Sequence, residues 1–255
     1  RLGADVFSEG KISPKNLKES ARTFKKFRQL TDKYHATKIR AVGTSALREA
    51  KNGDAYLELI RRKSKIEIEI IDGVEEARLI HLAVKREVHL DKVRALLIDI
   101  GGGSVELTIS DMMKRKKLEE TQLGSVIGEF LQPLTSFLNS QVSNKKIEFA
   151  VGTGGNLEAI GKLKAQLLGS KTTTMVTAQE LSDLIQKLQK LSYKQRVDEL
   201  KMRSDRADVI IPAALIVQTV MRQAGIEKLL IPHVGLKDGL LLSLVNDSYR
   251  GKSLG

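Results

Sequence analysis

The spacing of hydrophobic and polar residues changes most clearly over residues 95–110, where it predicts two strands separated by three glycines. Residues 95–98 are a continuous apolar run, which is typical of a strand that is buried on both faces. Residues 105–110 alternate apolar and polar side chains, which predicts a strand with one buried face. The expected structure is therefore strand, glycine turn and strand, with Asp99 at the edge of the turn.

Elsewhere the apolar residues mostly recur at helical spacing. Ser13 and Pro14 form a cap followed by proline at the first helical position, so an amphipathic helix is expected over residues 14–30. Further helices are expected over residues 44–56, 75–80, 128–138, 157–163, 181–191, 207–224 and 235–244. Short strands are expected over residues 38–43, 66–71, 147–151 and 229–234. No segment repeats at a fixed period, and no low-complexity linker separates the elements.

The composition is that of a globular chain, because 41% of the residues are hydrophobic and no apolar run is long enough to span a membrane. The absence of cysteine excludes disulfides, thiolate metal sites and a cysteine nucleophile, and it is compatible with a reducing cytoplasm. The four histidines are dispersed, so they do not indicate a metal site. We therefore expect a cytoplasmic protein without a membrane partner.

The formal net charge of +12 predicts attraction to polyanions. The chain has no tryptophan and only 4% aromatic residues, so few side chains are available for the bases of a single-stranded nucleic acid to stack on. This disfavours nucleic acid and favours a small or linear anion rich in phosphate. One face of the expected helix 14–30 is strongly basic and is either a solvated surface or one wall of an anion channel; it consists of Lys15, Lys18, Arg22, Lys25, Lys26 and Arg28.

The glycines of the 95–110 segment are compatible with phosphate binding. Three consecutive glycines can direct successive backbone N–H groups into one concavity, which a phosphate can approach without meeting a Cβ. Asp99 would repel a bare phosphate there, so we interpret it as a ligand of a Mg²⁺ ion that neutralises the phosphate, and Glu106 adds a second carboxylate. The alternative is an ordinary hairpin with a glycine-rich turn. A dinucleotide-binding loop is disfavoured, because a strand rather than a helix follows these glycines.

Two further positions are candidates for phosphate contacts. The segment from Gly152 to Asn156 lies between a short strand and a helix, whose N-terminus offers unpaired donors; a tight-packing turn is the alternative. Arg48 is expected in the first turn of the helix 44–56, where a cation opposes the helix dipole unless it binds an anion together with the free N–H groups. A solvated arginine is the alternative at that position.

Four segments together resemble the exopolyphosphatase and guanosine pentaphosphate phosphatase family (Ppx/GppA), which belongs to the actin, sugar-kinase and acetate-kinase superfamily. They are AVGTSALREAKN at 41–52, IEIIDGVEEARLI at 68–80, LIDIGGGSVEL at 97–107 and VGTGG at 151–155. Weaker support comes from RADVII at 206–211 and VGLKDGLL at 234–241. The order and spacing of the segments are those of the family, which makes the combination more specific than any single motif.

The resemblance implies the two-lobed actin-like (ribonuclease H-like) ATPase fold, an α/β class with mixed sheets flanked by helices. Lobe I is expected over residues 1–80 and lobe II over residues 81–255, with a final helix at about 236–250 that packs back across lobe I. The family starts with a strand and a phosphate loop of the D-x-G-S-x-S type, which this chain lacks, and we expect the gene to encode them upstream of Arg1. Larger relatives add a C-terminal helical domain, so the chain resembles the short form.

The resemblance also assigns roles to residues. Glu76 matches the carboxylate taken as the general base that orients water at the terminal phosphorus, and Arg48 matches an arginine near the phosphates. Asp99 matches the second phosphate motif and Glu106 matches an acidic residue of the same site; both are expected to hold the metal. The other matches are phosphate-binding positions in the two glycine turns: Gly101, Gly102, Gly103, Ser104, Gly152, Thr153, Gly154 and Gly155. Glu75 is expected only to complement the helix dipole.

The function that the resemblance implies is phosphoanhydride hydrolysis in a bacterial cytoplasm. The substrate is inorganic polyphosphate, guanosine pentaphosphate or both, and the two cannot be separated from sequence because they present the same terminal anhydride. The expected cofactor is Mg²⁺ or another hard divalent ion. Two alternatives stay open, a kinase of the same superfamily and a non-catalytic polyanion-binding relative. A homodimer is compatible with the resemblance.

Overall fold

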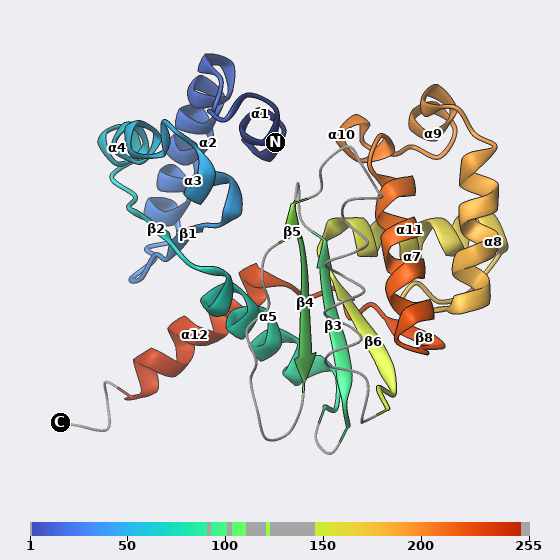
Figure 1. The fold of residues 1–255 in the computed structure, drawn as a ribbon. Helices are drawn as coiled ribbons and strands as arrows, with labels where there is room; N and C mark the ends of the chain where they lie inside the picture. Colours follow the sequence, from blue (N-terminus) through green and yellow to red (C-terminus); the bar gives the residue numbers. More distant parts are fainter. Residues whose placement is uncertain (1, 91–92, 101–103, 111–120, 123–145, 251–255) are drawn as a thin grey trace. The chain divides into compact units, whose positions relative to one another are not determined.

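The computed structural model describes residues 2–90, 93–100, 104–110, 121–122 and 146–250. The chain divides into two compact units, Arg1–Leu79 with Leu240–Gly255, and Ile80–Gly239 (Figure 1). The boundary between them falls within one helix, α5 (Gly73–Glu87). The helix expected over residues 128–138 lies outside the described residues, and the lobe boundaries stay a prediction.

The first unit is mainly helical and contains a two-stranded parallel sheet of β1 (Ala41–Gly43) and β2 (Ile68–Ile70). Its helices are α1 (Leu2–Glu9), α2 (Pro14–Lys33), α3 (Ser45–Glu49), α4 (Gly53–Ser64), the start of α5 and most of α12 (Leu236–Arg250). Ser13 caps α2, because its side chain accepts a hydrogen bond from the N–H of Asn16, as the sequence predicts. The core consists of the buried residues Val6, Ile12, Leu47, Tyr56 and Ile60.

The prediction of a single helix over residues 44–56 is wrong, because the structure has two helices there, α3 and α4. Ala50 follows α3 in an extended conformation, with φ −69° and ψ 119°. The side chain of Asn52 accepts a hydrogen bond from the Ile12 N–H (2.8 Å) and donates one to the Ile12 carbonyl (2.9 Å). These contacts hold the chain in a turn before α4 begins. Arg48 therefore lies in the last turn of a five-residue helix, where its charge complements the dipole instead of opposing it.

The second unit is built on a six-stranded mixed sheet with the order β5-β4-β3-β6-β8-β7. Strand β3 is parallel to β6, and β6 is parallel to β8, whereas the other pairs are antiparallel. The strands are β3 (Ala95–Ile100), β4 (Ser104–Ser110), β5 (Thr121–Gln122), β6 (Phe149–Thr153), β7 (Met175–Thr177) and β8 (Lys228–Leu230). The strand expected over residues 229–234 is shorter in the structure, where β8 ends at Leu230.

The described part of this unit also contains α7 (Gly155–Leu168), α8 (Ala178–Gln189), α9 (Tyr193–Asp198), α10 (Ser204–Ala207) and α11 (Ile210–Gln223). The helix expected over residues 207–224 begins only at Ile210. Within the ranges that the structure describes, no helix has the length and apolar character needed to cross a bilayer.

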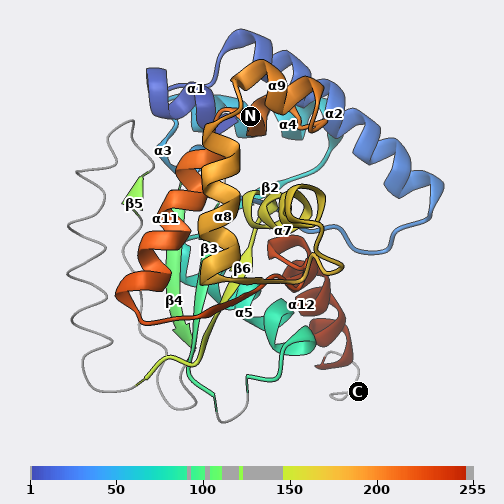
Figure 2. The same cartoon turned by 90° about the vertical axis from the view of Figure 1, so that its right-hand side faces the viewer.

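Helices cover both faces of the six-stranded sheet. The even-numbered residues of β3, 96–100, point to one face and pack in a large core with α7, α8 and α11. Leu97 points to the other face, where it packs with Ile80 and Val84 of α5. Figure 1 shows α5 on one side of the strands and α7 and α11 on the other, and Figure 2 looks onto the α8 and α11 side. Asp99 follows Leu97 by two residues, so it lies on the α5 face.

Candidate active site

The β3–β4 hairpin brings two carboxylates together. Both strands that the hydrophobic pattern predicts are present, and they pair antiparallel with Asp99 directly opposite Glu106. Residues opposite each other in such a pair project from the same face of the sheet, so both carboxylates lie on the α5 face. Asp99 is inside β3 instead of at the edge of the turn, because the strand continues to Ile100.

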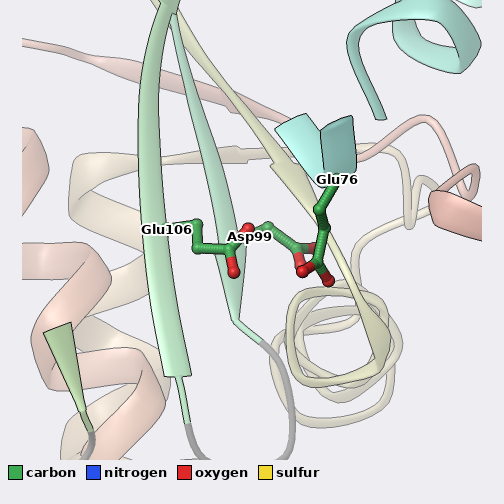
Figure 3. A group of neighbouring side chains, drawn as sticks. All are labelled: Glu76, Asp99 and Glu106. Atoms are coloured by element: carbon green, nitrogen blue, oxygen red, sulfur yellow. The ribbon is translucent and has the colours of Figure 1, made fainter. Parts of the chain in front are cut away.

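Glu76 reaches the same place from α5. It lies in the first turn of this helix, one turn before Ile80, which packs against β3 in the second unit. One ligand atom from each of Glu76, Asp99 and Glu106 lies within 4.8 Å of the others. Figure 3 shows the three side chains directed toward one another. The structure thus assembles a three-carboxylate cluster, hereafter the acidic cluster, from segments that are far apart in sequence.

The acidic cluster has the chemistry of a site for a hard divalent cation. All three donors are carboxylate oxygens, the ligand type that Mg²⁺, Mn²⁺ and Ca²⁺ prefer. Three negative charges at this separation repel one another, and a cation between them would remove that repulsion. Burial raises the pKa of Asp99, and a hydrogen bond from Thr153 acts in the opposite direction. The donor set therefore fits a hard divalent cation.

Arg48 lies beside the acidic cluster. Its Nη1 atom donates a hydrogen bond to the Ile71 carbonyl (2.5 Å) and lies 3.8 Å from Oε2 of Glu76. The Glu76 side chain is only 9% exposed, so this positive charge stabilises a buried carboxylate. Phosphate binding by Arg48 stays a prediction.

Glu75, next to Glu76, has different partners. Its carboxylate accepts two hydrogen bonds from Arg78 (2.6 and 2.7 Å) and a longer one from Arg40 (3.5 Å). The bonds to Arg78, and more weakly the proximity of Arg40, lower the pKa of Glu75. Within the described residues Glu75 is thus part of an ion-pair network and not of the acidic cluster.

The second glycine turn is packed tightly where β6 meets α7. A Cβ on Gly152 would lie 3.0 Å from the Leu157 side chain, and one on Gly155 would overlap the guanidinium of Arg206. Gly154 has a φ of 84°, which favours glycine. These contacts agree with the tight-packing alternative, and phosphate binding at Gly152, Gly154 and Gly155 stays a prediction.

Thr153 and Arg206 have contacts that the sequence pattern did not indicate. The Thr153 side chain, expected to meet phosphate, instead donates a hydrogen bond to Oδ1 of Asp99 (2.5 Å). In the sequence Arg206 belongs only to a weak motif, and its contact with Gly155 depends on tertiary structure. Ser104 is the first residue of β4, and the expected phosphate contacts at residues 101–103 lie outside the described residues.

Comparison with known proteins identifies the class to which this fold and site belong. A family model described as the Ppx/GppA phosphatase family matches residues 1–248, so the chain belongs to that family. Exopolyphosphatase 1 of Mycobacterium leprae is 26% identical over 97% of this chain and 80% of that protein. Exopolyphosphatase 2 of Mycobacterium tuberculosis is 25% identical over 96% of this chain and 86% of that protein.

Solved structures agree on the fold. An exopolyphosphatase from Cytophaga hutchinsonii superimposes with a TM-score of 0.84 at 23% identity, covering 94% of this chain and 85% of that one. The Aquifex aeolicus member of the Ppx/GppA family gives a TM-score of 0.75 at 22% identity, covering 97% and 87%. The expected α/β class, with the actin-like ATPase fold of this family, is confirmed.

Proposed function

We propose that this protein is a hydrolase that releases the terminal phosphate of inorganic polyphosphate. Family membership and relatives named exopolyphosphatases support the substrate class. The observation that carries the proposal is the acidic cluster, in which Glu76 lies beside the two carboxylates of the hairpin. Phosphoanhydride hydrolysis requires a positioned water and compensation of phosphate charge, and these three residues suit both needs.

In the proposed reaction Asp99 and Glu106 would hold the divalent ion, and Glu76 would orient the attacking water. A bound Mg²⁺ would neutralise charge on the phosphate oxygens. The water oxygen forms a bond to the terminal phosphorus while the bond to the bridging oxygen breaks. Glu76 accepts the proton of the water, and the bridging oxygen leaves as the new end of the shortened chain. Arg48, whose Nη1 lies 3.8 Å from Oε2 of Glu76, would place a positive charge beside this carboxylate.

The surface of α2 supports a linear polyanion as substrate. Arg28 pairs with Asp32 at 3.0 Å, but the other five cations of its basic face are exposed and form no salt bridge within the described ranges: Lys15, Lys18, Arg22, Lys25 and Lys26. They lie along three turns of one helix, about 16 Å at 1.5 Å per residue. A long chain of phosphates would be attracted to this stripe, whereas a single phosphate would engage only a small part of it. Guanosine pentaphosphate presents the same terminal anhydride and is included as a second substrate.

The test is phosphate release by the full chain from polyphosphate and from guanosine pentaphosphate, with Mg²⁺ and no phosphoryl acceptor. We expect steady release from polyphosphate that stops when a chelator is added. A kinase of the same superfamily would instead require an acceptor, and a non-catalytic relative would bind polyphosphate without releasing phosphate. Either result would refute the proposed function.

A further inference from the structure

The hydroxyl of Thr153 makes a contact that the proposed reaction does not use. Strands β3 and β6 are parallel neighbours, and Asp99 and Thr153 are partners in their register. Side chains at partner positions lie on the same face, which here is the α5 face. The Thr153 residue is 1% exposed and its Oγ1 donates to Asp99 Oδ1 at 2.5 Å. A buried hydroxyl with this partner has little opportunity to contact a substrate directly.

The same carboxylate oxygen is enclosed on a second side by Gly154. A Cβ at this position would lie 3.0 Å from Asp99 Oδ1 and 2.9 Å from the Ile100 carbonyl oxygen. Only glycine combines the φ of 84° with so close an approach of the backbone. The side chain of Asn156 adds a longer contact, 3.4 Å, to the same Ile100 carbonyl. The β6–α7 turn therefore holds both the end of β3 and one oxygen of Asp99.

We propose that Thr153 is a positioning residue, which fixes the Asp99 carboxylate so that its other oxygen is presented to the cation. The inference rests on the proposed metal-assisted hydrolysis. With Oδ1 held by a hydrogen bond, rotation of the carboxylate about its last torsion breaks that bond. Outer partners of metal-ligating carboxylates typically change metal affinity by about 10- to 100-fold when they are removed. The second glycine turn thus acts through Asp99, in addition to any contact with substrate.

Three substitutions at position 153 separate the hydroxyl from the volume of the side chain. Thr153→Val keeps the shape and removes the donor, whereas Thr153→Ser keeps the donor and removes a methyl group. Thr153→Ala removes both and covers the case in which the valine variant does not fold. Thr173→Val is a matched control, because Thr173 belongs to the same unit and its hydroxyl contacts His233 (3.3 Å) instead of the acidic cluster.

The measurement is Mn²⁺ binding to the full chain without substrate. Binding is monitored by the decrease of the electron paramagnetic resonance signal of the free ion. We expect Thr153→Val and Thr153→Ala to raise the dissociation constant about 10- to 100-fold. Thr153→Ser and Thr173→Val are expected to stay within about threefold of the unmodified chain. Activity is measured in parallel as a function of Mg²⁺, and the half-saturating concentration should rise in the same order. A thermal unfolding curve for each variant checks that it is folded.

Unchanged Mn²⁺ affinity in a folded valine or alanine variant would overturn the inference. Equal losses in the serine and valine variants would also overturn it, because the methyl group and not the hydroxyl would then matter. If the unmodified chain releases phosphate and binds Mn²⁺ while the variants behave like it, only the role of Thr153 fails. If the unmodified chain does neither, the proposed function fails and this inference fails with it.

Discussion

Replacing Glu76 and Glu75 by glutamine in turn tests the mechanism most directly. The two residues are adjacent in the first turn of α5, so both changes affect the same helix and remove one carboxylate of the same size. Successive residues lie about 100° apart around a helix, which directs the two side chains to different surroundings. The structure places Glu76 in the acidic cluster and Glu75 against Arg78 and Arg40.

The expected loss of turnover in Glu76→Gln follows from the role of a general base. A positioned base contributes about 10²- to 10⁴-fold, which corresponds to about 3 to 5 kcal/mol of activation free energy. Glutamine keeps the hydrogen-bonding shape but accepts no proton. Because the substitution leaves the contacts to the phosphates in place, the Michaelis constant for polyphosphate should change little.

The substitution is not expected to unfold the protein. At 3.8 Å, the attraction between Arg48 and Glu76 amounts to about 4 kcal/mol with an effective dielectric constant of about 20. At 4.8 Å or less, repulsion from each ionised neighbour, Asp99 and Glu106, amounts to about 3.5 kcal/mol or more on the same scale. The removed terms have opposite signs, so in the metal-free protein Glu76→Gln should be neutral or stabilising.

Glu75→Gln should show the opposite pattern. Glu75 and Arg78 are about one-third exposed, with side-chain exposures of 28% and 37%, and such pairs typically contribute about 1 kcal/mol or less. For a chain of this size the loss lowers Tm by about 2 to 4 °C. Turnover should stay within a few-fold of the unmodified enzyme.

The assay is steady-state phosphate release from polyphosphate, with thermal unfolding of each variant measured in the same buffer. Equal activity of the two variants would refute the assignment of the base. A severe loss confined to folded Glu75→Gln would refute it as well, and would move the catalytic role to the residue that contacts Arg78.

Three further predictions concern the metal, the substrate and pH. Asp99→Asn should weaken Mg²⁺ activation by at least tenfold, and undiminished turnover of the unmodified enzyme in excess chelator would contradict a metal requirement. Changing Lys18, Arg22 and Lys25 together to glutamine should raise the Michaelis constant for long polyphosphate more than for short chains. The increase should be larger at low salt than at high salt. A Michaelis constant that depends on neither chain length nor salt concentration would mean that the stripe only solubilises the protein. Because the fold lowers the pKa of Glu75, this residue stabilises the protein above the ordinary glutamate pKa of about 4.3 and ceases to do so as the pH falls through its lowered value. The difference in unfolding free energy between the unmodified chain and Glu75→Gln should therefore shrink below about pH 4, and a difference that is constant with pH would exclude this explanation.

Local patterns predicted the hairpin well, because its determinants lie within sixteen residues. The apolar run of β3 and the alternation of β4 have the burial that their spacing indicates, with Val105 and Leu107 in the core. The family motif selects Glu76 over Glu75, and in the structure Glu76 lies in the acidic cluster whereas Glu75 contacts Arg78 and Arg40. The catalytic role of Glu76 stays a prediction.

Distant contacts explain what the sequence pattern missed. The break between α3 and α4 depends on Asn52 bonding to Ile12, forty residues earlier, which no helical periodicity can indicate. The bond between Thr153 and Asp99 joins residues fifty-four positions apart and requires the register of two parallel strands. The residues next to each motif indicate neither the contact of Asn52 with Ile12 nor the bond between Thr153 and Asp99.

The alternation along β3 has a consequence for insertions and deletions in this strand. Residues 96, 98 and 100 belong to the large core, whereas Asp99 belongs to the face of Leu97. Inserting one residue between positions 95 and 98 would shift the strand by one step, carry the Asp99 carboxylate into the core and place an isoleucine beside Glu76 and Glu106. Inserting two residues would restore the orientation of every side chain. Lineages of this protein should therefore accept length changes in β3 only in even steps.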